Sequence, residues 1–114
     1  MTSQPTTVVN VRLDLCDCYI GRKGVGGSRH MLNTKAGEPG WLGNPFRPNE
    51  GDAIGRFRLA FKQRLKDDGE FRLAVLALRG KRLGCWCAGK DGLTADGPVK
   101  CHGQVIAAFV DSVQ

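Results

Sequence analysis

A short apolar run at residues 83–87, Leu-Gly-Cys-Trp-Cys, constrains the fold of this chain more than any other feature. Apolar runs of about four to eight residues next to glycine are typical of a strand that is buried on both faces of a sheet. The segments on either side, 52–80 and 101–113, instead carry apolar residues at helical spacings. A buried strand between helical segments predicts a layered α/β domain.

Three helices are expected from these spacings. The first spans 52–68, begins at Asp52 as its N-cap and repeats the apolar residues Ile54, Phe57, Phe61 and Leu65. The second follows the break at Asp68-Gly69, ends at Gly80 as a C-terminal cap and packs through Phe71, Ala74, Val75 and Leu78. The third spans 101–113 and is expected to turn inward Val105, Ala108, Phe109 and Val113. The first helix also has a basic face, either a nucleic-acid contact or a solvated surface, formed by Arg56, Arg58, Lys62, Arg64 and Lys66.

The N-terminal part of the chain is expected to supply two short strands and a long loop. Residues 1–7 are predicted to be a flexible leader. The β-branched run 8–12 and the segment 18–21 are predicted to be strands. A glycine-rich loop follows over 22–43, and its part 23–39 is predicted to be a mobile insert, because long irregular segments in small domains are often functional or mobile.

The whole pattern predicts one domain over residues 8–114, a small Rossmann-like layered α/β fold with about three helices and a short sheet of about three or four strands. A turn-rich segment at 88–98 is expected to lead from the last strand to the last helix. A chain of 114 residues is long enough for one hydrophobic core. Its 41% of hydrophobic residues is typical of a folded protein, so extensive disorder is excluded.

Charge and hydropathy limit the class of partner. The formal net charge of +6 favours anionic partners such as nucleotides or nucleic acids. The lysines and arginines form no dense tract, however, so a solvated basic surface is the alternative. No segment approaches the roughly 20 apolar residues that cross a bilayer, and the start has no signal-peptide core. We therefore expect no membrane partner and a cytoplasmic location, whereas the oligomeric state is left open.

The cysteines gather near the ends of predicted elements. Five cysteines, an odd number, are expected to be thiols or metal ligands rather than disulfides. Strand alternation places Cys85 and Cys87 on one face and Trp86 on the other. The next helix begins at Cys101-His102, and ligand sites in α/β sheets lie where a strand ends beside the start of the next helix. We therefore expect these side chains to converge.

Three interpretations of this cluster stay open. In the first, Cys85 or Cys101 is a catalytic nucleophile or proton donor and His102 is the general acid or base. In the second, the cluster holds a zinc ion with the ligands Cys85, Cys87, Cys101 and His102. The spacing is unfavourable for zinc, because an adjacent Cys-His pair does not easily aim both side chains at one ion. In the third, the thiols are small buried apolar side chains. No other cofactor is expected.

A second candidate region is the segment 40–46, Gly-Trp-Leu-Gly-Asn-Pro-Phe. Its glycines let the backbone approach a ligand, and Asn44 offers both a donor and an acceptor. A planar base is expected to stack on one of three aromatic rings, Tyr19, Trp41 or Phe46. A phosphate is expected to bind one of three cations, Arg22, Lys23 or Arg47. The alternative is a tight Asn-Pro turn that is anchored by two core aromatic residues.

Four motifs, in this order, resemble those of one family: Tyr-Ile-Gly-Arg at 19–22, Gly-Asn-Pro-Phe at 43–46, a run ending in Cys-Trp-Cys at 80–87 and Cys-His-Gly at 101–103. The chain resembles the domain-of-unknown-function family DUF4326 from about Val8 to Val110. The resemblance implies a compact domain of microbes and their viruses, in the host cytoplasm if viral, and no established activity. Two departures are Gln104, where the family's usual residue is acidic, and a longer insert before Trp41. If that acidic position is catalytic, this chain binds its ligand without turnover.

These observations lead to one expected function and two alternatives. We expect the four motif segments to form a pocket for a nucleotide, a nucleotide-derived metabolite or a nucleic acid. The first alternative is a zinc-stabilised Cys/His interaction module without catalysis. The second is a Cys/His-dependent nucleotide-processing enzyme, in which Asn44 and Arg22 position the substrate. Whether the domain is an enzyme is not determined by the sequence.

Overall fold

Helices and strands are interleaved along the chain. The computed structural model describes residues 6–12, 16–46, 51–85, 93–94 and 101–113. Their elements are β1 (Thr7–Asn10), β2 (Cys18–Tyr19), the 3₁₀ helix η1 (Val25–Gly27), α1 (Ala53–Asp67), α2 (Gly69–Leu76), β3 (Arg82–Cys85), β4 (Leu93–Thr94) and α3 (His102–Ser112). The predicted mixed α/β class is confirmed. Within the described ranges, no helix has the length and apolar character that crossing a membrane requires.

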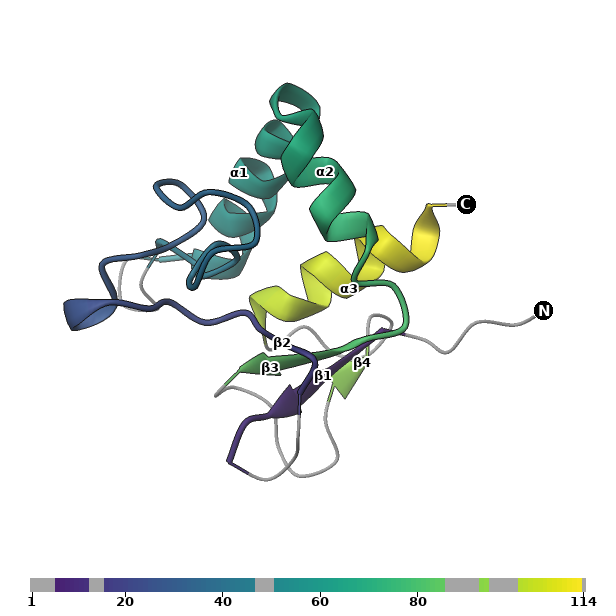
Figure 1. The fold of residues 1–114 in the computed structure, drawn as a ribbon, viewed down its shortest axis with the longest axis horizontal. Helices are drawn as coiled ribbons and strands as arrows, with labels where there is room; N and C mark the ends of the chain where they lie inside the picture. The colour runs from purple at the N-terminus through teal and green to yellow at the C-terminus, as the bar shows by residue number, and fades with distance from the viewer. Residues whose placement is uncertain (1–5, 13–15, 47–50, 86–92, 95–100, 114) are drawn as a thin grey trace.

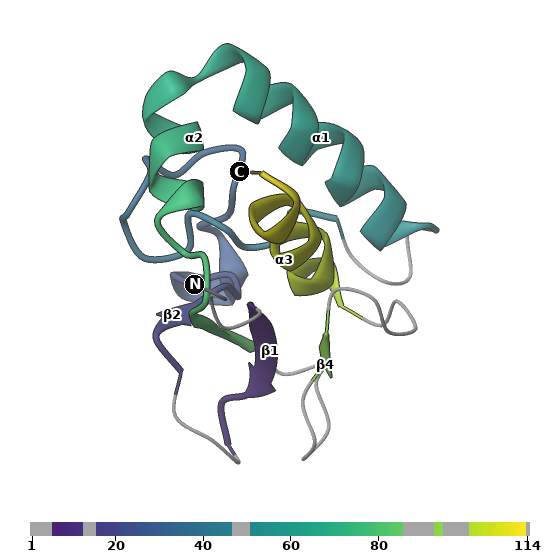
Figure 2. The same cartoon turned by 90° about the vertical axis from the view of Figure 1, so that its right-hand side faces the viewer.

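The described strands form one sheet in the order β2-β3-β1-β4 (Figures 1 and 2). β1 and β2 run parallel to β3, whereas β4 is antiparallel to β1. β3 therefore has a partner on each side, as its apolar sequence predicts; Trp86 and Cys87 lie outside the described residues. Parallel pairing of Asn10 with Cys85 brings the carboxyl ends of β1 and β3 to the same edge of the sheet.

The helices stack on one face of the sheet, and α3 lies between the sheet and the α1–α2 pair (Figures 1 and 2). α3 contacts β1 and β4 as well as α1 and α2. Its first turns are consequently buried from His102 to Ala107, without an exposed side. The predicted inward face of this helix is wrong at Ala108, which is exposed. Because the first turns are buried on every side, their sequence has no polar stripe that marks the outward side on which Ala108 lies.

Capping side chains determine where α1 and α2 begin. Asp52 Oδ1 accepts a hydrogen bond from the Gly55 N–H at 3.0 Å, as predicted for an N-cap. Asp68 Oδ1 does the same for the Phe71 N–H at 3.1 Å, so α2 starts directly after α1. The face that α1 buries was also predicted correctly, with Phe57, Phe61 and Leu65 inside. The two helices therefore form a continuous cover over α3.

α2 ends earlier than the sequence predicts. Its last residue is Leu76 and its C-cap is Ala77, whereas Gly80 lies in the following turn with a φ of 76°. The helix ends because the next amides donate to carbonyls three residues back, which tightens the chain, at Leu78, Arg79 and Lys81. Gly80 serves this turn, where a positive φ favours glycine, and not the helix terminus.

The predicted flexible leader is wrong for its last two residues. Thr6 is fully buried, and its N–H and Oγ1 both donate to the Asp111 carboxylate near the end of α3, at 3.0 and 2.6 Å. Thr6 Oγ1 also accepts the Gly80 N–H at 2.9 Å. Thr7 is already part of β1. The partner of Thr6 lies 105 residues away in the sequence, so no local pattern predicts this contact. Residues 1–5 lie outside the described part.

The segment 88–98 contains a strand that the sequence analysis does not predict. Leu93 and Thr94 form β4 and pair with Val8 and Thr7 on the outer side of β1. A two-residue strand has no periodicity, so only its antiparallel pairing with β1 identifies it. The rest of the segment 88–98 lies outside the described residues.

The long loop is irregular, as predicted, but it contains an internal β-bridge and is also held by a side chain of α1. A β-bridge joins Lys23 to Arg29 across η1. Further along, Met31 and Thr34 are buried, and the Arg64 guanidinium donates to both of their carbonyl oxygens. The mobility of 23–39 stays a prediction, and any movement of this segment has to break these contacts.

The packing of α3 against the sheet predicts that a methyl group is not tolerated at Gly103. A Cβ there would overlap Ile20 Cδ1 and press on Val8. We expect Gly103→Ala to lower the free energy of unfolding by about 1–3 kcal/mol, although alanine is the better helix former by about 1 kcal/mol. Urea denaturation measures the change.

Gly69→Ala is the matched control, because Gly69 also lies in the first turn of a helix and an added Cβ there meets nothing within 4 Å. We expect this variant to be as stable as the parent or slightly more stable. Equal destabilisation by the two substitutions would contradict tight packing at Gly103.

Candidate functional site

His102 lies where three segments of the chain meet. Its ring is 8% exposed, and its Nε2 atom lies 2.8 Å from the Ile20 carbonyl oxygen. Since a carbonyl only accepts, Nε2 carries the proton in this contact and Nδ1 is left as an acceptor. The edge of the ring packs against Phe57 of α1, with the ring centroids 4.8 Å apart. The imidazole thus connects α3 with the end of β2 and with α1.

Cys101 is the N-cap of α3, and its sulfur faces two nitrogen atoms. Cys101 Sγ accepts the Gly103 N–H at 3.4 Å and lies 3.8 Å from His102 Nδ1. The Gln104 side chain completes a capping box, because its Oε1 accepts the Cys101 N–H at 3.0 Å. In this structure, therefore, Gln104 has a capping contact at the position where the family resemblance implies an acidic residue.

Cys85 is the last residue of β3 and faces Cys101. The two sulfur atoms are 3.1 Å apart, and both side chains are buried, with exposed fractions of 2% and 1%. Neither residue forms a disulfide. Three of the four side chains that were expected to converge, Cys85, Cys101 and His102, therefore lie together, whereas Cys87 lies outside the described residues. We call these three residues the thiol–imidazole cluster.

Burial lowers the pKa of His102. The main cause is the loss of water around the ring, and the positive charge of Arg22 acts in the same direction. The carbonyl groups of Ile20 and Leu42 and the neighbouring Cys85 oppose this effect without reversing it. The imidazole is consequently neutral at neutral pH, as a proton acceptor has to be. Because Ile20, Arg22 and Leu42 all act on the pKa of His102, the segments 19–22 and 40–46 both lie next to the thiol–imidazole cluster.

Arg22 is half-buried, and its charge acts on two histidines. Its charge lowers the pKa of His102, and it also lowers the pKa of His30, for which burial is the larger cause. Gly43 packs against its backbone, since a Cβ at Gly43 would lie 2.7 Å from Arg22 Cα. Among the described residues, no carboxylate forms an ion pair with Arg22. The site thus contains a positive charge that the described part of the chain does not neutralise.

The side-chain amide of Asn44 stabilises the Asn-Pro turn. Asn44 Oδ1 accepts the Phe46 N–H at 2.9 Å, and Asn44 Nδ2 donates to the Ala53 carbonyl at 3.2 Å. The side chain therefore shapes the turn and ties it to the start of α1. This favours the structural interpretation of Asn44 over a direct contact with ligand. Arg47 lies outside the described residues.

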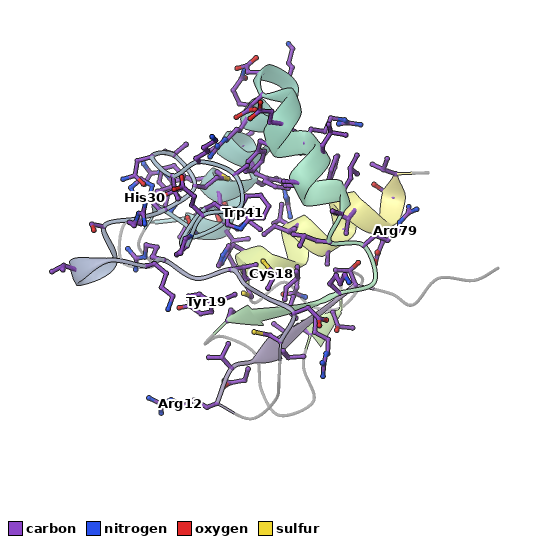
Figure 3. The ribbon with its side chains drawn as sticks, viewed as in Figure 1. Arg12, Cys18, Tyr19, His30, Trp41 and Arg79 are labelled. Carbon is purple, nitrogen blue, oxygen red and sulfur yellow. The ribbon has the colours of Figure 1, made fainter. Side chains whose placement is uncertain are left out.

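The three aromatic candidates have different environments. Trp41 is 6% exposed and packs edge-on against Phe71, so it is a core residue (Figure 3). Tyr19 and Phe46 are only half-buried. Each has a cation over its ring: Lys23 Nζ lies 5.1 Å from the Tyr19 centroid, and the Arg56 guanidinium lies 4.5 Å from that of Phe46. Tyr19 and Phe46 thus combine a planar surface with positive charge, which Trp41 does not.

Comparison with known families identifies the family of this chain. A family model described as "Domain of unknown function (DUF4326)" matches residues 6–112. The chain belongs to the DUF4326 family. The resemblance inferred from the motifs is therefore confirmed, over nearly the whole chain. Searches of curated proteins and of solved structures found no match.

The predicted zinc set is only partly described in this DUF4326 domain. In the described ranges, no group of three or more His, Cys, Asp or Glu side chains is arranged to hold a metal ion. His102 Nε2 is directed at the Ile20 carbonyl, which leaves only Nδ1 for a ligand. The fourth predicted ligand, Cys87, lies outside the described residues. A zinc site with all four residues stays a prediction.

Two contacts of this site were not predicted from the sequence. The Ile20 carbonyl that holds His102 is a backbone group, and nothing in the side-chain sequence marks one carbonyl among many. Phe57 was predicted only as a core residue of α1, although its ring also contacts His102. The helical period that identified Phe57 gives its buried face but not its neighbour.

The lowered pKa of His102 predicts a loss of stability in mild acid. Its pKa in the unfolded chain is near the ordinary value of 6.5, and the folded pKa is lower. As the pH falls below about 6.5, the unfolded state therefore takes up the proton first, and stability decreases down to the folded pKa. We expect His102→Gln, whose amide can still donate to Ile20, to flatten this decrease between about pH 7 and pH 5. Urea denaturation at several pH values measures it.

His30→Gln is the control, because the pKa of His30 is lowered too but its ring is more exposed than that of His102. We expect His30→Gln to retain most of the decrease. The carboxylates whose pKa values are lowered, Asp17 and Asp68, lose their contributions below this pH range. A decrease that is unchanged in His102→Gln would show that the folded protein binds the proton at His102 as readily as the unfolded chain.

Proposed function

We propose that this DUF4326 domain binds a nucleotide or a nucleotide-derived anion beside the thiol–imidazole cluster. The observation that carries the proposal is the half-buried Arg22, which lies close enough to His102 and His30 to lower both of their pKa values and has no carboxylate partner among the described residues. A half-buried charge without a counter-charge costs free energy, which a bound anion offsets. The net charge of +6 favours the approach of such a ligand.

A nucleotide supplies a planar base as well as a phosphate, and the same region offers partners for both. The half-buried ring of Tyr19 lies three residues before Arg22 and is already paired with the Lys23 ammonium. Base–aromatic stacking beside a cation is a common way to hold nucleotides. Arg22 and Lys23 then bind the phosphate oxygens.

The start of α3 is less suited to the phosphate than the sequence suggests. The Gly103 N–H is bonded to Cys101 Sγ, and the Gln104 N–H is bonded to the Cys101 carbonyl oxygen. Ile20 also packs directly over Gly103. The N–H groups of Gly103 and Gln104 are therefore already bonded to Cys101, and we assign the phosphate to Arg22 instead.

A small ligand is favoured over a long nucleic acid by the spread of the basic side chains. Figure 3 shows Arg12 at the bottom of the molecule and Arg79 on its right-hand side, beside α3. Arg79 is also engaged within the chain, since its Nε donates to the Val110 carbonyl at 3.0 Å. A duplex would require a continuous basic surface, whereas a nucleotide needs only the local charge near Arg22.

A thermal-shift screen with AMP, ATP and ADP-ribose tests the proposal. Ligand at about 100 times its Kd stabilises a protein by about 2.7 kcal/mol, so we expect a rise of several degrees in Tm with at least one of them. Arg22→Gln should remove the shift. Lys66→Gln, an exposed charge on α1, should keep it. No shift with any of these nucleotides would contradict the proposal, and a shift with single-stranded DNA or RNA alone would replace it with nucleic-acid binding.

A second candidate function is favoured by the surroundings of Cys101. The Gly103 N–H and the unprotonated His102 Nδ1 both face its sulfur, and the Ile20 carbonyl fixes the orientation of the imidazole. This is the arrangement of a Cys–His catalytic pair: Cys101 is the nucleophile, His102 is the base, and the Ile20 carbonyl orients the base. In this interpretation, Cys101 attacks an electrophilic carbon of a nucleotide derivative bound at Arg22, and His102 accepts the thiol proton. The bond from that carbon to its leaving group breaks, and the leaving group departs with the electron pair and takes the proton from His102.

Labelling with iodoacetamide at neutral pH tests this second function. We expect Cys101 to react about tenfold faster than Cys16, although Cys101 is almost completely buried and Cys16 is not, because only Cys101 has an adjacent base. His102→Gln should abolish the difference. Mass spectrometry of the digested protein reports each site. An order of labelling that simply follows exposure, with Cys16 first, would contradict an activated Cys101.

A further inference from the structure

We propose that Cys85 and Cys101 form a redox-active dithiol, in which a peroxide joins the end of β3 to the start of α3 through a reversible disulfide. The proposal does not depend on nucleotide binding. It rests on the arrangement of two sulfur atoms that belong to different elements and are 16 residues apart in the sequence. Each residue is also fixed at the terminus of its element, Cys85 as the last residue of β3 and Cys101 as the N-cap of α3.

The distance between the sulfurs carries the inference. Cys85 Sγ and Cys101 Sγ are 3.1 Å apart, so an approach of about 1 Å brings them to bonding distance. Both backbones are held by other contacts, since Asn10 pairs with Cys85 and Gln104 Oε1 accepts the Cys101 N–H. The two sulfur atoms can therefore form a bond without a rearrangement of the fold.

The surroundings of Cys101 make it the first sulfur to react. The Gly103 N–H donates to its Sγ, and His102 Nδ1 lies 3.8 Å away as an acceptor for the thiol proton. The Cys101 thiolate attacks one oxygen of the peroxide and the O–O bond breaks. The oxygen that leaves takes the proton held by His102 and departs as water or an alcohol. Cys101 is then a sulfenic acid. The sulfur is oxidised by two electrons, and these electrons reduce the peroxide.

Cys85 completes the reaction. Its sulfur attacks the sulfenic sulfur of Cys101, the S–S bond forms, and the S–O bond breaks. The hydroxide that leaves takes the proton of the Cys85 thiol and becomes water. In sum, two thiols and one peroxide give one disulfide and two molecules of water, or one of water and one of an alcohol. A dithiol reductant reverses the reaction.

The other described cysteines are placed differently. Cys16 Sγ packs over Gly84, the residue before Cys85, because a Cβ built at Gly84 would lie 2.5 Å from it. Since side chains alternate along a strand, this is the face of β3 opposite to the Cys85 side chain. Cys18 Sγ donates to the Tyr19 carbonyl oxygen at 3.8 Å. Neither residue is in a position to replace Cys101 as the partner of Cys85.

Peptide mapping after treatment with hydrogen peroxide tests the proposal on the full chain. Trypsin cuts after Arg82, Lys90 and Lys100, so Cys85 and Cys101 fall in different peptides. We expect the peptides 83–90 and 101–114 to be linked, with the loss of two hydrogens, and to separate on addition of dithiothreitol. Because 83–90 also contains Cys87, the mapping is repeated with Cys87→Ser, which should keep the link.

Cys85→Ser and Cys101→Ser complete the design. In Cys85→Ser the link should be absent, and the sulfenic acid on Cys101 should be trapped by dimedone. In Cys101→Ser neither the link nor a dimedone adduct on Cys85 should form at the same peroxide concentration. Thermal unfolding before and after oxidation adds a second measurement, since a cross-link across residues 86–100 should raise the Tm of the parent chain and leave that of both variants unchanged.

Four outcomes would overturn the proposal. A link that persists in Cys85→Ser and disappears in Cys87→Ser would assign the bond to Cys87. Peroxide-resistant thiols in the folded parent chain would show that the pair is inert. Cross-links that involve Cys16 or Cys18 alone would place redox chemistry elsewhere. Protein purified with one zinc ion per chain, whose removal by a chelator frees Cys85 and Cys101 for labelling, would make the pair a metal site.

Discussion

The burial of the first turns of α3 is the constraint on which the rest of this structure depends. The helix enters the interior between the sheet and the α1–α2 pair, and its polar side chains have to find partners there because water does not reach them. His102 finds the Ile20 carbonyl, and Gln104 finds the Cys101 N–H. Gly103 lets the helix approach β1 and Ile20 closely. The hydrogen bonds that stabilise the fold are therefore the same ones that orient the thiol–imidazole cluster.

Because the same hydrogen bonds stabilise the fold and orient the thiol–imidazole cluster, they also explain the chemistry that we assign to it. A buried imidazole that donates from Nε2 to a carbonyl is neutral and keeps Nδ1 as an acceptor. The thiol of Cys101 faces that nitrogen and lies beside a second thiol, in surroundings from which water is largely excluded. Arg22 adds a positive charge at the edge of the cluster. Anion binding and thiol oxidation thus use different groups of one region, so they can be tested separately.

Much of the architecture could be predicted because its causes are local. The helical spacing and the Asp52 cap give α1 nearly to the residue, and the glycine-bounded apolar run gives the central strand. Two of the errors have a common origin. Ala108 was expected inside and Thr6 was expected in a flexible leader, but α3 is surrounded by other elements and Thr6 is held by Asp111. Both features depend on partners that are distant in the sequence, which local periodicity does not contain.

The sequence by itself determined the α/β class, the start of each helix and the family of the chain, because apolar periodicity, capping residues and ordered motifs are properties of neighbouring residues. Only the tertiary structure decided which motif atoms meet. It turned Asn44 toward the backbone of α1, put Trp41 into the core and placed His102 on the carbonyl of a residue 82 positions earlier. The physical reason is that a hydrogen bond or a sulfur contact requires approach within a few ångströms, and for distant residues this is set by the packing of the whole chain.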